Sequence, residues 1–106
     1  MIARDKVPAA LLESVRNSLQ ITWADDAADE RLRGIIAAGT VYLDSKGGGA
    51  LDYMADGLPR TLLMEYARYA RDAALDVFET NYQAIILAMQ TERQVTGYVE
   101  SSSPTE

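Results

Sequence analysis

The chain has 106 residues, of which 48% are hydrophobic and 25% are charged, and its formal net charge at pH 7 is −6. It contains no Cys and no His, which excludes disulfide bonds and thiolate chemistry and removes the most common metal ligand and neutral-pH base. A chain of this length fits one domain, its hydrophobic content excludes wholesale disorder, and its acidic excess argues against nucleic-acid binding through a basic face.

Two further features bear on location. No apolar run approaches the roughly 18 residues that a membrane span needs. Residues 1–10 are polar and mixed rather than signal-like. We therefore expect a cytoplasmic protein with no membrane partner.

The first helix is predicted to begin at Pro8 and to reach about Gln20, after a loose arm that ends near Val7. Apolar residues recur with helical spacing along this stretch and form one stripe: Leu11, Leu12, Val15 and Leu19. This spacing predicts an amphipathic helix that faces the core.

A second helix is predicted to begin at Thr22-Trp-Ala-Asp25, which matches the Ser/Thr-x-x-acid pattern of a capped helix start. Its apolar stripe carries Ala28, Leu32, Ile35, Ile36, Tyr42 and Leu43. Gly39 lies within that stripe, where the absence of a side chain would let another helix approach closely. On the outer face we expect an ion pair between Asp29 and Arg33, which are four residues apart.

Four acidic residues gather at this helix start: Asp25, Asp26, Asp29 and Glu30. Carboxylates could hold a divalent cation, but a calcium loop alternates its ligands around a Gly, and that pattern is absent. Acidic residues also stabilise the positive end of the helix dipole. We therefore predict a solvated first turn and no metal site.

The segment Ser45-Lys-Gly-Gly-Gly49 is predicted to end the second helix, because consecutive glycines cost much backbone entropy when they are ordered. We expect a flexible surface loop from here to about Gly57, in which residues 50–54 could add a short helical turn. The loop lacks the spacing of a phosphate-binding loop.

The longest helix-forming stretch runs from Leu58 to Arg93, and Pro59 suits the first turn of its helix. On one unbroken helix the apolar face would turn by roughly 120° beyond Thr80. Thr80-Asn-Tyr-Gln83 fits a capping box. We therefore predict two helices, with a bend near Thr80 and an end near Arg93.

Within this stretch, Tyr66-Ala-Arg68-Tyr69-Ala-Arg71 interleaves aromatic and basic residues, as proteins that bind single-stranded nucleic acid do. On a helix, however, both tyrosines fall on the apolar face and both arginines point away. We interpret the segment as core tyrosines with solvated arginines. Because no nucleophile with a base relay and no cofactor motif can be identified, we predict no catalytic residue, no cofactor and no enzyme activity.

From Gln94 to Glu106 the chain is predicted to be extended and then disordered, with Tyr98 and Val99 as the residues most able to contact a partner. The predicted fold class is therefore all-α: a small bundle of about four helices with a flexible Gly-rich loop. One domain takes residues 1–93, and the tail takes residues 94–106.

The order of these features resembles the head-tail connector proteins of long-tailed bacteriophages, also called head-completion or adaptor proteins. The matching features are Leu11 to Thr22, Asp25-Asp26, Leu32, Ile35-Ile36, Tyr42-Leu43, Leu58-Pro59, Leu62-Leu63, residues 66–71, Phe78-Glu79 and a final helix. The resemblance covers roughly Val7 to Arg93 and rests on hydrophobic signatures rather than on a catalytic motif.

The resemblance implies a structural virion protein whose copies, twelve in that family, form a ring between the capsid portal protein and the stopper or tail-completion protein. The ring would extend the channel through which DNA passes without sequence-specific binding. The protein would be present in the host cytoplasm during assembly. Tyr98 and Val99 are then candidate partner contacts, and Gly47, Gly48 and Gly49 form a loop that could be remodelled on assembly.

A second hypothesis comes from a different class: a small acidic helical regulator that binds a host or phage protein. A stable dimer, or a one-to-one complex with a non-virion protein, would favour it.

Overall fold

The computed structural model describes residues 1–21 and 25–102, with side chains described as far as Glu92. These residues form a short 3₁₀ helix, η1 (Arg4–Lys6), and four α-helices, with no strand among them. The helices are α1 (Ala9–Ser18), α2 (Asp26–Gly47), α3 (Leu58–Arg71) and α4 (Leu75–Ser102). The predicted all-α fold class is confirmed.

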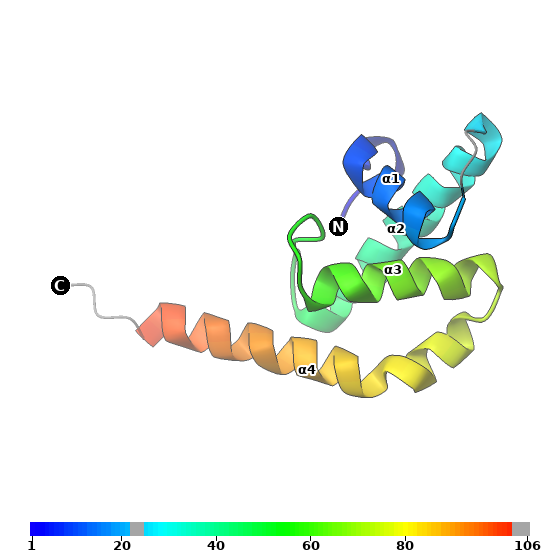
Figure 1. Cartoon of the computed structure of the whole chain (residues 1–106). Helices are drawn as coiled ribbons and strands as arrows, with labels where there is room; N and C mark the ends of the chain where they lie inside the picture. Colours follow the sequence, from blue (N-terminus) through cyan, green and yellow to red (C-terminus); the bar gives the residue numbers. More distant parts are fainter. Residues whose placement is uncertain (22–24, 103–106) are drawn as a thin grey trace.

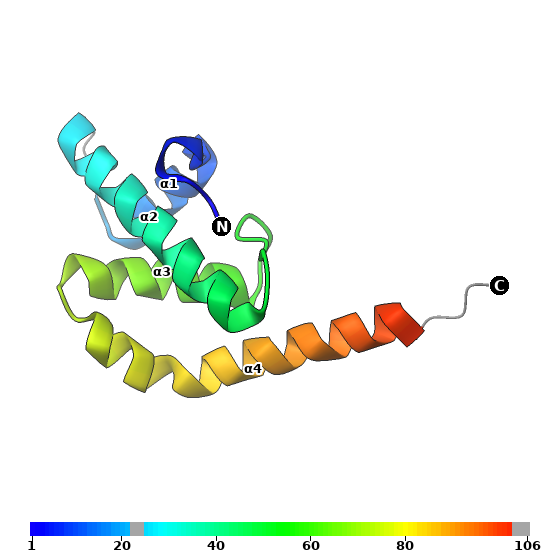
Figure 2. The same ribbon diagram turned by 180° about the vertical axis from the view of Figure 1, so that it is seen from behind.

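The helices α2 and α3 cross at the centre of the molecule, and α1 packs against both (Figures 1 and 2). The first half of α4 runs back along α3, and its carboxyl half projects away from the other helices. The molecule therefore measures 53 × 30 × 19 Å, with a radius of gyration of 15.0 Å. A compact chain of this length would have a radius of gyration of about 13 Å.

Gly39 marks the crossing of α2 and α3, as its place in the apolar stripe predicted. A Cβ atom added at Gly39 would lie 2.8 Å from Leu63 Cδ1 and 2.8 Å from Tyr66 Cδ1. Both neighbours are buried side chains of α3. The missing side chain therefore allows the two backbones to approach closely.

The core continues from this crossing into all four α-helices. The apolar stripe predicted for α1 is buried at all four positions. Phe78 of α4 lies at the centre of an aromatic cluster, with its ring centroid 5.1–6.2 Å from those of four tyrosines. The tyrosines are Tyr42, Tyr66, Tyr69 and Tyr82, from α2, α3 and α4. These ring contacts join α4 to the rest of the bundle.

The predicted division into two helices at Thr80 is wrong, because the break between helices lies at residues 72–74 and α4 continues through Thr80. The helix nevertheless curves in this region, as Figures 1 and 2 show where its ribbon is yellow. Ala73 takes a left-handed conformation with φ 56°. The Ala73 N–H bonds to the Ala70 carbonyl at 3.1 Å, and the Ala74 N–H bonds to the Tyr69 carbonyl at 2.8 Å. This pair of bonds is the Schellman motif, which satisfies the last carbonyls of α3.

Thr80 lies inside α4, where its hydroxyl donates to the Asp76 carbonyl at 3.4 Å. The earlier break allows α4 to begin at Leu75 and to turn Phe78, Ile86 and Met89 toward the core as one face. The apolar face that seemed to need a new helix at Thr80 is thus provided by one curved helix that begins earlier, at Leu75.

The second helix begins at Asp26, later than the predicted start at Thr22, a residue outside the described part of the chain. Its N-cap is Asp25, whose carboxylate accepts a hydrogen bond from the Ala27 N–H at 3.1 Å. Asp caps a helix through the following N–H groups as well as Thr does, so the acidic cluster offered a second start that the sequence did not exclude.

The predicted pair of Asp29 with Arg33 does not form. Asp29 instead pairs with Arg16 of α1, at 3.3 Å, and Arg33 pairs with Glu30, at 2.7 Å. The packing of α1 against α2 brings Arg16 close to Asp29. Glu30 lies three residues before Arg33 on the same helix, a spacing that lets the two side chains pair.

The amino-terminal residues, predicted to be a loose arm, lie against α2. The Ile2 N–H donates to Thr40 Oγ1 at 3.0 Å, and Arg4 Nη2 donates to the Glu30 carbonyl at 2.9 Å. Val7 is buried in the core. Polar groups of α2 and one apolar residue therefore hold a segment that has no helical periodicity of its own.

The chain beyond Arg93, predicted to be extended, continues as helix to Ser102. The helix thus crosses the domain boundary expected at residues 93–94. Apart from Gly97, residues 94–102 contain no strong helix breaker, and an existing helix adds one hydrogen bond for each residue it orders. Residues 103–106, which complete the predicted tail, lie outside the described part.

Candidate interaction surfaces

The acidic cluster at the start of α2 is divided among separate roles. Asp25 caps the helix, Asp29 pairs with Arg16, and Glu30 contacts Arg4 and Arg33 at 3.5 and 2.7 Å. Among the described residues, no group of three or more acidic side chains could hold a metal ion. The cluster behaves as dipole compensation and local ion pairing.

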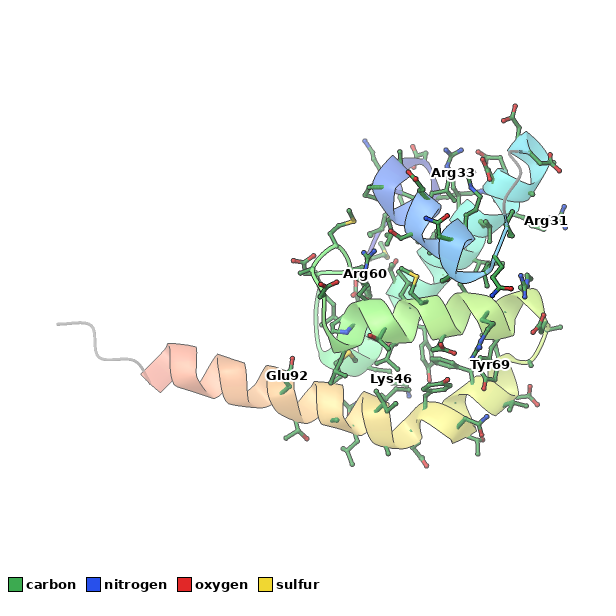
Figure 3. The ribbon with its side chains drawn as sticks, in the orientation of Figure 1. Arg31, Arg33, Lys46, Arg60, Tyr69 and Glu92 are labelled. Atoms are coloured by element: carbon green, nitrogen blue, oxygen red, sulfur yellow. The ribbon has the colours of Figure 1, made fainter. Side chains whose placement is uncertain are left out.

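The tyrosines and arginines of α3 separate as the helical spacing predicted. Tyr66 is buried, and Tyr69 is half-buried against Phe78. Arg68 pairs with Glu65, and Arg71 Nη1 donates to the Leu19 carbonyl at 3.1 Å. Figure 3 places Tyr69 between α3 and α4. The segment therefore serves packing and leaves no stacked aromatic platform for nucleic acid.

Three glycines end α2 as the sequence indicated, in a geometry that only Gly adopts easily. Gly47 is the last helical residue, and Gly48 follows with φ 81° as the C-cap. The Gly49 N–H bonds to the Asp44 carbonyl at 3.0 Å. Residues 50–54 form no helical turn.

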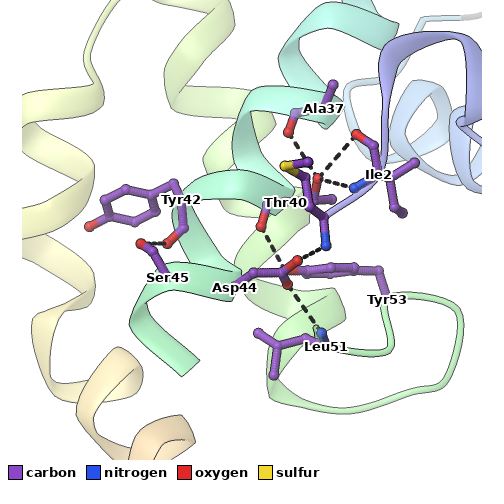
Figure 4. A network of polar contacts seen from close by, with 9 residues as sticks. Ile2, Ala37, Thr40, Tyr42, Asp44, Ser45, Leu51 and Tyr53 are labelled. Carbon is purple, nitrogen blue, oxygen red and sulfur yellow. Dashed lines mark hydrogen bonds and ion pairs between the residues drawn. The ribbon is translucent and has the colours of Figure 1, made fainter. Parts of the chain in front are cut away.

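The loop that follows is held by a buried polar network rather than lying wholly on the surface (Figure 4). Asp44 accepts hydrogen bonds from Tyr53 Oη at 2.5 Å and from the Leu51 N–H at 3.1 Å, and it also pairs with the amino group of Met1. Tyr53 is 2% exposed. Because Asp44 has several donors, its carboxylate is stabilised despite burial.

Sequence reasoning did not predict this network. Thr40 and Asp44 lie four residues apart on α2, and their partners come from the chain start and from the loop. Polar residues at that spacing inside an apolar stripe are the one mark that could have suggested it.

Three tyrosines have pKa values raised above their ordinary value. Burial raises the pKa of Tyr42, and the nearby Glu79 carboxylate adds to the effect. Burial alone raises the pKa of Tyr66. For Tyr82, burial is the largest cause, followed by its hydrogen bond to Glu65 at 2.9 Å. The ordinary, protonated form of each phenol is therefore favoured.

A groove of about 480 Å³ lies between the end of α2 and the middle of α4. Its lining mixes apolar and polar side chains: Tyr42, Lys46, Glu79, Gln83, Ala84, Ile86, Leu87 and Gln90. Leu87 at its edge is 61% exposed. The side chains that line the groove do not form a convergent set of catalytic groups.

A smaller groove of about 270 Å³ lies between the start of α2 and the end of α3. Its apolar lining is Ile21, Ala28, Leu32, Ile35 and Ala70. Two arginines, Arg31 and Arg71, stand at its rim. Sequence reasoning assigned Ile35 and Ala70 to core faces and did not foresee that the two helices leave them partly open.

The tail residues that the sequence singled out, Tyr98 and Val99, belong to the last three turns of α4. Their side chains lie outside the described part of the structure. Gln90 of α4 contacts the Lys46 carbonyl beside the glycines at residues 47–49. From there the end of α4 projects away from α2, so these two candidate regions do not form one site (Figure 1).

No protein-family model matches the chain, and no curated protein or solved structure is significantly similar to it. Within the described residues, no helix combines the length and the apolar character that crossing a membrane requires.

Proposed function

We propose that the protein is a structural, non-enzymatic component of a bacteriophage virion that forms a ring adaptor between the capsid portal and the stopper or tail. The proposal starts from the order of helical signatures between Val7 and Arg93 that resembles the head-tail connector proteins. In this role the ring, of twelve copies, extends the DNA channel at the head-tail interface.

One observation of the fold supports the proposal most. A compact body of α1, α2 and α3 carries a long helix, α4, whose carboxyl half projects away from that body (Figure 1). A projecting helix offers surface to neighbouring chains rather than to the core of its own chain. This shape suits a protein that works by assembly.

The charge of the chain is compatible with the same role. The net charge of −6 disfavours adhesion of DNA phosphates to the protein. A channel that DNA must traverse benefits from that repulsion, because a strongly basic lining would retain the strand.

Electron microscopy of a phage lysate with an early stop codon in this gene, for example at Leu12, tests the proposal. Filled or leaking heads beside complete, unattached tails are the expected result. Joined, infectious virions in the same lysate would contradict it.

The second candidate function is a small acidic helical regulator that binds a host or phage protein. The groove beside Leu87 favours it, because a mixed apolar and polar groove can receive a helix or loop of one partner. Purification of the protein from infected cells separates the two candidates. A one-to-one complex with a non-virion protein would support the regulator, whereas recovery with portal protein would support the adaptor.

A further inference from the structure

The groove between α2 and α3 combines two features that point to one kind of partner. Its walls are apolar and half-buried, with Leu32 as the most buried of its side chains. Its rim carries the guanidinium groups of Arg31 and Arg71. An apolar floor between two cations suits an apolar segment with acidic neighbours.

The charges at this rim stand out in an acidic chain. The sequence has sixteen acidic and ten basic residues. Arg31 is exposed and forms no ion pair within the described residues. Arg71 lies 3.6 Å from Asp72 and keeps its hydrogen bond to Leu19. Arg31 is therefore free to pair with an acidic partner.

The chain itself contains a segment of the required composition. Residues 94–106 have no Lys or Arg, and they contain Val95, Tyr98 and Val99 followed by Glu100. Apolar residues followed by an acid match the apolar floor and cationic rim of the groove. The basic residues of the chain all precede this segment.

Geometry excludes the segment of the same chain as the occupant. Arg31 lies at one end of the molecule, and Glu92 lies on the part of α4 that leads away toward the opposite end (Figure 3). The helix continues in that direction to Ser102, and the molecule is 53 Å long. The segment can therefore reach this groove on another copy.

We propose that residues 94–106 of one copy bind the groove between α2 and α3 of a second copy, with Arg31 pairing with the acidic residues of that segment. Such a contact joins two different surfaces, so it is head-to-tail, and repeated head-to-tail contacts close into a ring when the rotation permits. The inference deepens the proposed adaptor function, because it names the contact that would join neighbouring copies in the ring, and it rests on that function for the ring's role in the virion.

Paramagnetic NMR on the full chain tests the contact directly. The chain has no Cys, so Val99→Cys introduces a single site for a nitroxide label. Chains at natural isotope abundance that carry the nitroxide are mixed with ¹⁵N-labelled chains that carry no nitroxide. We expect selective broadening of the amides of Ala28, Leu32 and Ile35, since only contact between copies can bring the label to them.

A nitroxide at Ser45→Cys, on an exposed position of α2, is the matched control. Equal broadening from both labels would indicate general aggregation and overturn the proposal. No broadening of the groove amides in the mixed sample would overturn it as well. So would broadening that appears only when nitroxide and ¹⁵N are on the same chain.

Charge reversal gives a second, independent readout. Arg31→Glu should weaken self-association, measured by analytical ultracentrifugation, by roughly tenfold. Lys6→Glu changes the net charge equally at an exposed residue outside the groove and should leave association nearly unchanged. Equal weakening by both variants would contradict a specific role for Arg31.

The outcomes separate this inference from the adaptor proposal. Rings seen by electron microscopy without broadening at the groove would remove the inference and keep the adaptor. Broadening at the groove together with normal virions from the stop-codon phage would keep the self-association and remove the adaptor.

Discussion

At the scale of single residues, Gly39 and Gly34 form a matched pair on α2. A Cβ at Gly39 would meet two buried side chains of α3 at 2.8 Å, whereas a Cβ at Gly34 would meet only the Arg4 guanidinium, at 3.6 Å. Overpacking costs roughly 1–3 kcal/mol, and replacing Gly with Ala in a helix gains up to about 1 kcal/mol.

We therefore predict that Gly39→Ala lowers the free energy of unfolding by about 1–2 kcal/mol and that Gly34→Ala raises it by up to about 1 kcal/mol. Urea denaturation of both variants measures the two changes. Stabilisation by Gly39→Ala would show that α2 and α3 do not cross as closely as described.

Tyr53 is the second residue whose role can be measured. Its hydroxyl donates to the buried Asp44 carboxylate at 2.5 Å. Tyr53→Phe would remove a donor from a buried charge, and the expected loss of unfolding free energy is about 1–3 kcal/mol. Tyr42→Phe is the control, because the Tyr42 hydroxyl has no hydrogen bond of ordinary geometry within the described residues. Equal effects of the two changes would argue against the network.

At the scale of elements, the break between α3 and α4 gives opposite expectations for two positions. Ala73 has φ 56°, a conformation that costs an L-residue roughly 1–2 kcal/mol and costs Gly almost nothing. Ala73→Gly should therefore raise the unfolding free energy by up to about 1 kcal/mol, after the greater chain entropy of Gly is subtracted.

Thr80→Ala provides the comparison for that measurement. If Thr80 capped a helix, its loss would cost about 1 kcal/mol. Because Thr80 is exposed within α4, the same change should be neutral or stabilising by a few tenths of a kcal/mol. Thermal or urea unfolding of the two variants therefore locates the break.

At the scale of the whole molecule, the aromatic cluster links stability to alkaline pH. Folding raises the pKa of Tyr42, Tyr66 and Tyr82 above the ordinary value of 10.0. Protonated phenol is the neutral form, so their contribution is fully present below pH 10. It is lost as the pH rises through the raised folded pKa, because the unfolded chain releases these protons first.

Unfolding free energy measured between pH 8 and pH 11.5 should therefore decline above about pH 10. Tyr66→Phe should shift the curve by a constant amount below that pH and make the decline shallower above it. A decline with the same slope in the variant would remove Tyr66 from the explanation.

The sequence by itself determined the all-α class and the buried faces of the first helices. Helical spacing predicted the buried stripe of α1, Gly39 predicted the close crossing, Pro59 the start of α3, and the glycines the end of α2. Each of these features follows from local backbone geometry and from the tendency of apolar side chains to avoid water. Both can be read from a short stretch of sequence without knowing which element packs against it.

Where two local sequence signals competed, only the tertiary structure decided which of them formed. The break at Ala73 prevailed over the capping pattern at Thr80 because the aromatic contacts of Phe78 set the rotation of α4. The start of the chain binds α2 because Thr40 and Asp44 supply partners from a distant segment. The groove beside Arg31 likewise exists because α2 and α3 diverge. Such contacts join residues far apart in the chain, and one sequence carries no local record of them.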